Sequence, residues 1–84
     1  MAKILIVDND PIVRRCHTEL LALLIPEHEF PTASDGQEAS ELIAAGDIGY
    51  VVTDLDMPRK NGLQLTTWVR QRFPWVVVIM LQVI

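Results

Sequence analysis

The segment YVVTDLDMPRKNG, residues 50–62, decides how the rest of the chain is interpreted. It opens with the apolar run Tyr50–Val52, whose β-branched and aromatic residues suit a buried strand. The run ends at Asp54, a second acid follows at Asp56, and Pro58 stops any sheet ladder because proline has no amide hydrogen. A carboxylate at the carboxyl end of a buried strand is placed for chemistry, since open parallel sheets bind their ligands outside those strand ends.

Size, charge and cysteine content limit the function. The chain has 84 residues, enough for one domain over residues 1–84, and half of them are hydrophobic. The formal net charge of −4 argues against a nucleic-acid-binding surface, which needs clustered Lys and Arg. The N-terminal apolar run stops at Asp8, far short of a membrane span or a signal peptide, so no membrane association is expected. The single cysteine, Cys16, permits no internal disulfide and favours a cytoplasmic location.

The chain alternates between strand and helix patterns. Apolar runs predict strands at 4–7, 29–33, 50–54 and 75–81, and helical spacing of apolar residues predicts helices at 11–25, 37–45 and 62–73. Such alternation indicates an α/β fold with a parallel sheet and right-handed crossovers. Pro31 confines the weak second strand to an edge, and the two strands that end in acids are expected at the centre. The predicted spatial order of the strands is therefore 2-1-3-4.

Local patterns also predict the helix ends and the buried faces. Asp10, Asp35 and Asn61 each precede a helical pattern and are predicted N-caps. Trp68 is expected in the core, and His17, which has no convergent partner, is expected at the surface. The first helix is expected to expose a charged face that includes Arg14 and to bury an apolar stripe of Ile12, Cys16, Leu20 and Leu23, widened by Val13 and Leu24.

Polar side chains at the predicted strand ends form the candidate site. In the order 2-1-3-4, Asp8, Asn9, Asp54 and Asp56 converge in one crevice between the first and third strands. Several carboxylates in one crevice repel each other unless a cation joins them, and oxygen ligands favour Mg²⁺, which needs only one or two carboxylates. Once the ion neutralises the site, a phosphoryl group can approach Asp54, because a carboxylate is a suitable nucleophile for it.

Several motifs, in order along the whole chain, resemble the receiver domain of two-component response regulators. They are VDNDP at 7–11, ASDGQEA at 33–39, TDLDMP at 53–58, NG at 61–62, FP at 73–74 and the apolar run 77–81. The resemblance implies a flavodoxin-like, three-layer fold in which Asp54 accepts a phosphoryl group from a histidine kinase or a phosphotransfer protein. It also implies that Asp8 and Asn9 help to bind Mg²⁺ and that Asp56 offers the metal its backbone carbonyl. Such a domain is a phosphoacceptor rather than an enzyme, with autodephosphorylation at most.

The sequence departs from the receiver pattern at the site and near its end. The second acid of the family's metal pair is replaced by Asn9, whose amide brings no charge, so the affinity for Mg²⁺ should fall. Gln82 aligns with the family's Ser or Thr that contacts the phosphoryl group, and the family's lysine after the fifth strand is absent. The fourth helix, the fifth strand and the last helix are absent too, so the chain resembles a receiver that is truncated after its fourth strand.

Two other functions stay open. Asn9, Gln82 and the absent lysine favour a degenerate pseudo-receiver that binds a partner without phosphorylation, and Mg²⁺ binding separates it from a working receiver. The Asp54–Asp56 segment is also similar to the nucleophile motif of haloacid-dehalogenase-like phosphatases. That motif usually follows the first strand rather than the third, and turnover of a generic phosphate ester would support it.

The predicted fourth strand is apolar on both faces and has no neighbour on its outer side. Trp75, Val77, Ile79 and Leu81 are expected to point one way, and Val76, Val78 and Met80 the other. An unpaired edge of this kind is a template for pairing with another chain. We therefore expect a homodimer in which the two fourth strands lie side by side and antiparallel about a two-fold axis.

Overall fold

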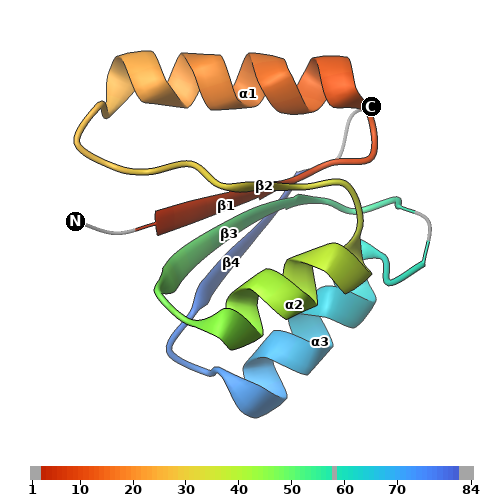
Figure 1. Ribbon diagram of the computed structural model, residues 1–84. Coiled ribbons are helices and arrows are strands. Elements are labelled where there is room, and N and C mark those ends of the chain that lie inside the picture. Colours follow the sequence, from red (N-terminus) through yellow and green to blue (C-terminus); the bar gives the residue numbers. More distant parts are fainter. Residues whose placement is uncertain (1–2, 58, 82–84) are drawn as a thin grey trace.

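The computed structural model describes residues 3–57 and 59–81 of the chain (Figure 1). Strands and helices alternate along it in the order that the sequence predicts. The elements are β1 (Lys3–Val7), α1 (Pro11–Leu24), β2 (Thr32–Ala33), α2 (Gly36–Ala45), β3 (Ile48–Asp54), α3 (Gly62–Arg72) and β4 (Val77–Leu81).

The strands form one parallel sheet in the order β2-β1-β3-β4, which confirms the predicted topology. β2 is shorter than predicted, and Glu29 makes only an isolated bridge with Lys3. Pro31 offers no amide hydrogen, but its carbonyl oxygen accepts a hydrogen bond from the amide of Ile6 at 2.9 Å. The segment that contains Pro31 thus lies at an edge, just before β2, and β1 and β3 hold the centre.

Helices cover the two faces of the sheet unequally. α1 lies alone on one face, while α2 and α3 lie side by side on the other (Figure 1). The main core fills the space between the sheet and the α2–α3 pair, where apolar side chains are removed from water. It consists of Leu5, Val7, Ala33, Ala39, Ile43, Ile48, Val51, Met57, Leu65, Val69 and Val76.

The predicted buried stripe of α1 is wrong. Ile12 and Leu23 are 73% and 81% exposed. The half-buried residues Val13, His17 and Leu21, spaced by four, form the side of the helix nearest the sheet. A helix that lies alone on one face of the described sheet buries only its underside, so the rest of the wide apolar stripe stays in contact with water. Its other members are exposed as well: Cys16, Leu20 and Leu24.

The helix ends follow the local patterns. Asp10 caps α1, Asp35 caps α2, and Asn61 caps α3 in a capping box, each by accepting a hydrogen bond from a backbone amide of the first turn. Gly46 ends α2 with φ 101°, a conformation that residues with a Cβ rarely adopt. The predicted caps are therefore confirmed.

β4 begins later than predicted, at Val77 rather than Trp75. Residues 74–76 form a turn after α3, and Trp75 is 71% exposed on it. The ring of Phe73 lies near the rings of Trp68 and Trp75, with centroid distances of 5.4 and 5.6 Å. Trp68 is half-buried against the margin of the core rather than fully inside it.

Candidate functional site

Asp8 and Asp54 lie at the carboxyl ends of the two central strands. The register pairs Val7 of β1 with Thr53 of β3, so the two acids occupy neighbouring strand ends. Both line one small cavity of about 20 Å³, which His17 of α1 also lines. The fold thus brings two of the predicted site residues together at the switch point between β1 and β3.

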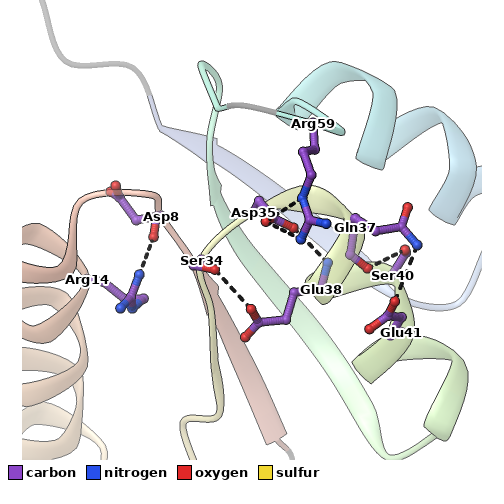
Figure 2. Close-up of polar contacts among 9 residues, drawn as sticks. All are labelled: Asp8, Arg14, Ser34, Asp35, Gln37, Glu38, Ser40, Glu41 and Arg59. Atoms are coloured by element: carbon purple, nitrogen blue, oxygen red, sulfur yellow. Dashed lines mark hydrogen bonds and ion pairs between the residues drawn. The ribbon is translucent and has the colours of Figure 1, made fainter.

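Asp8 is held in place by the turn that follows β1. Its Oδ1 accepts a hydrogen bond from the amide of Asp10 at 2.9 Å. Its backbone carbonyl oxygen accepts one from Nη1 of Arg14 at 2.7 Å (Figure 2). Asp8 is only 7% exposed, and Arg14, predicted to face solvent, is half-buried against this turn.

The other two predicted site residues lie on the loops rather than in the cavity. Asn9 and Asp56 are exposed, and neither lines the cavity that Asp8 and Asp54 share. Asp56 still contacts Asp54, because its amide donates a hydrogen bond to Oδ1 of Asp54 at 3.4 Å. The conformation of the loop after β3 therefore affects the orientation of the Asp54 carboxylate.

The donors at the strand ends and on their loops are oxygens, and His17 of α1 adds a ring nitrogen to the cavity lining. Two carboxylates, with the Asn9 amide and the Asp56 carbonyl on the adjoining loops, suit Mg²⁺, which takes one or two carboxylates and keeps several waters. Within residues 3–57 and 59–81, no group of three His, Cys, Asp or Glu side chains is arranged to hold a metal ion. The residues therefore fit a hydrated Mg²⁺ rather than a metal such as Zn²⁺, which is held by a full set of protein ligands.

Sequence reasoning missed the contacts of two residues, His17 and Arg59, and made one prediction that falls outside the described residues. His17 lines the cavity, so its assignment to the surface is wrong; its spacing of four residues from Leu21 would have placed both on one helix face. Arg59 pairs with Asp35, 24 residues away, and no local pattern indicates that contact. Gln82 lies outside the described residues, so its predicted place beside the phosphoryl group stays a prediction.

Asp35 carries the one clearly perturbed carboxyl group among the described residues. Its pKa lies below the ordinary value, mainly because the amide of Glu38 donates a hydrogen bond to its charged form. Removal from solvent opposes this effect, and the hydrogen bond and positive charge of Arg59 lower the pKa further. The Asp35 carboxylate is therefore charged at neutral pH and paired with Arg59.

A comparison with known protein families decides where this chain belongs. The sequence pattern of the response regulator receiver domain matches residues 4–83. This chain belongs to the response regulator receiver family. The receiver is 37% identical over 81 residues to the transcriptional regulatory protein LnrK of Bacillus subtilis, and the match covers 96% of this chain and 37% of LnrK.

Solved receivers have the same flavodoxin-like fold. TrrA of Thermotoga maritima in complex with Mg²⁺-BeF superposes with a TM-score of 0.90 at 30% identity, over 98% of this chain and 70% of TrrA. TrrA in complex with the histidine kinase ThkA gives a TM-score of 0.88 at 30% identity, over 98% and 69% of the two chains. The receiver thus spans about two thirds of these solved chains and a smaller share of its curated relatives. Among its described residues, no helix is long and apolar enough to cross a membrane.

Proposed function

We propose that this receiver accepts a phosphoryl group on Asp54 from a histidine kinase or a phosphotransfer protein and acts in a two-component phosphorelay. The observation that carries the proposal is the position of Asp8 and Asp54 at neighbouring strand ends, where both line one cavity. The structures of TrrA, a solved relative, in complex with Mg²⁺-BeF and with a histidine kinase support a phosphoacceptor role for this receiver. We propose residues 1–84 as one receiver unit and the cytoplasm as its location.

The step assigned to Asp54 is nucleophilic. One carboxylate oxygen forms a bond to phosphorus while the bond from phosphorus to the donor's histidine nitrogen breaks, and that nitrogen keeps the electron pair. Mg²⁺, when bound, supplies positive charge against the phosphoryl oxygens. Asp8, Asn9 and Asp54 would hold it through side-chain oxygens, and Asp56 through its backbone carbonyl. The hydrogen bond from the next turn to Asp8 keeps that carboxylate at the cavity.

Phosphorylation with a small-molecule donor tests this assignment directly. The protein is incubated with Mg²⁺ and acetyl phosphate, and its intact mass is measured. We expect an adduct of one phosphoryl group in the wild type and none in Asp54→Asn. Asp47→Asn is the matched control, because Asp47 is exposed before β3, at the opposite end of that strand, and should keep the adduct. An adduct that persists in Asp54→Asn would contradict the assignment.

A second candidate function is a pseudo-receiver that binds a partner without phosphorylation. Asn9 supports it, because the amide replaces one of the charges that hold the metal. If the wild type neither binds Mg²⁺ nor gains a phosphoryl group, the pseudo-receiver becomes the better assignment. The third alternative, a haloacid-dehalogenase-like phosphatase, has no supporting observation, because the chain belongs to the receiver family. We propose no enzyme activity beyond autodephosphorylation.

We also propose that the 84-residue chain forms a homodimer through β4. Val77, Ile79 and Leu81 are 48%, 46% and 40% exposed on the α1 side of this edge strand. An antiparallel pair centred on Ile79 would set each of these side chains opposite another apolar one. A two-fold axis perpendicular to the sheet would also place both α1 helices on the same face, so that their exposed apolar flanks cover the joined strands.

A further inference from the structure

The start of α2 meets the loop that follows Asp54 and leads to α3, residues 55–57 and 59–61 in the described part of the chain, which we call the acceptor loop. Nε and Nη2 of Arg59 donate hydrogen bonds of 2.9 and 2.5 Å to Oδ2 of Asp35 (Figure 2). The other carboxylate oxygen, Oδ1, accepts a hydrogen bond of 2.8 Å from the amide of Glu38 in the first turn of α2. Asp35 therefore joins the start of α2 to the loop between Asp54 and α3, with one oxygen for each. We call the Arg59–Asp35 contact the loop latch.

The loop is in close contact with its surroundings on both sides of the latch. Gly36 lies so near the loop that a Cβ on it would be 1.7 Å from the carbonyl oxygen of Lys60. Nζ of Lys60 lies 4.8 Å from the ring centroid of Trp68 on α3. The backbone approach, the cation–π contact and the latch hold the same short segment at three points.

The backbone of Arg59 is itself unusual. Its φ is 58°, in the left-handed region, which residues other than glycine rarely adopt. Such a conformation costs free energy and persists only where the surrounding contacts hold it. Its two hydrogen bonds to Asp35 are contacts of that kind, and the Asp35 side chain is largely buried.

We propose that Arg59 is a positioning residue for the acceptor site and acts through Asp35. This inference rests on the proposed phosphoacceptor function. Arg59 is three residues beyond Asp56, whose amide contacts the Asp54 carboxylate. The latch therefore holds the loop that orients Asp54 before any ligand binds, so that Mg²⁺ binding does not have to order it.

Charge removal at either end of the latch tests the proposal. Asp35→Asn keeps an N-cap for α2, because Asn caps as well as Asp, but it loses the ion pair. Arg59→Ala removes the same pair from the loop side, and Arg59→Lys keeps the charge for partial rescue. Arg15→Ala is the matched control, because Arg15 forms an exposed ion pair with Glu19 on α1.

Two measurements report the result. Hydrogen exchange of the amides at 55–57 and 59–62 is followed in the metal-free protein, and the Mg²⁺ dissociation constant is measured from Trp68 fluorescence in a Trp75→Phe background. We expect Asp35→Asn and Arg59→Ala to speed loop exchange about tenfold and to weaken Mg²⁺ binding about three- to tenfold. A tenfold change in exchange rate corresponds to a free energy similar to that of one charge-assisted hydrogen bond. The double variant should bind Mg²⁺ no more weakly than either single variant, since both substitutions remove the same contact.

The outcomes separate this inference from the function on which it rests. Faster loop exchange with unchanged Mg²⁺ affinity in Asp35→Asn and Arg59→Ala would overturn the positioning role and leave the phosphoacceptor function intact. Additive losses in the double variant would also overturn it, because the two residues would then act separately. A wild type that neither binds Mg²⁺ nor gains a phosphoryl group would contradict the phosphoacceptor function and the positioning role with it.

Discussion

Gly36, the first residue of α2, lies directly against the backbone of Lys60 in the loop that leads to α3. A Cβ at position 36 would be 1.7 Å from the carbonyl oxygen of Lys60 and 2.6 Å from its carbonyl carbon. These atoms belong to the backbone and cannot rotate away as the end of a side chain can. The first turn of α2 can therefore approach the loop after β3 this closely because position 36 has no side chain.

Gly36→Ala should destabilise the fold. The methyl group would force α2 and the loop apart, and overpacking of this kind costs about 1–3 kcal/mol. Urea unfolding followed by circular dichroism measures the loss. Gln37→Ala is the control, because Gln37 is exposed on the same turn and its replacement should stay within about 0.5 kcal/mol. Equal stability of the two variants would show that the close approach is not maintained in solution.

Asn9→Asp should strengthen Mg²⁺ binding. The substitution adds a charged oxygen ligand beside Asp8 with little change in shape, and ligand charge raises the affinity of such sites. We expect a dissociation constant roughly three- to tenfold lower by calorimetric titration. Asn61→Asp adds the same charge at the N-cap of α3, where Asp caps equally well, and serves as the control. Equal affinity of wild type and Asn9→Asp would show that position 9 does not face the metal.

The stability of the fold should fall in acid partly through Asp35. Its folded-state pKa is lowered, first by the hydrogen bond from the amide of Glu38 and further by Arg59. Its contribution is therefore fully present above the unfolded value of about 3.9 and is lost as pH falls through the folded pKa. Asp35→Asn should flatten this part of the curve of unfolding free energy against pH. If the unfolding free energy of Asp35→Asn falls with acidification as steeply as that of the wild type, Asp35 does not contribute to the acid sensitivity of the fold.

Ile79→Lys should convert the proposed dimer to a monomer. Ile79 lies at the middle of the edge strand β4 and is 46% exposed, so a charge there would be buried at the centre of the proposed interface. Light scattering at tens of micromolar protein measures the mass. Leu63→Lys places the same charge on α3, at a residue 59% exposed, and should leave the dimer intact. A stable, well-folded monomer of the wild type would defeat the dimer proposal.

Local sequence determined the elements of this receiver and their order. The apolar runs before Asp8 and Asp54 identify the central strands, and Pro31 marks the edge, because proline lacks an amide hydrogen for the ladder. The caps at Asp10 and Asp35 were predictable for a similar reason: a cap bonds only to amides two or three residues away. Topology then follows, since parallel strands joined by right-handed crossovers leave few arrangements.

Only the tertiary structure decided which side chains meet. The apolar stripe of α1 is wider than the sheet can cover, so Leu23 is exposed, and His17 lines the cavity beside Asp8 and Asp54. A helical pattern shows which residues share a face, not what lies opposite that face. The pairing of Arg59 with Asp35 and the approach of Gly36 to Lys60 are likewise absent from any local pattern. These contacts join segments 24 residues apart, and they form because the sheet holds the start of α2 beside the loop after β3.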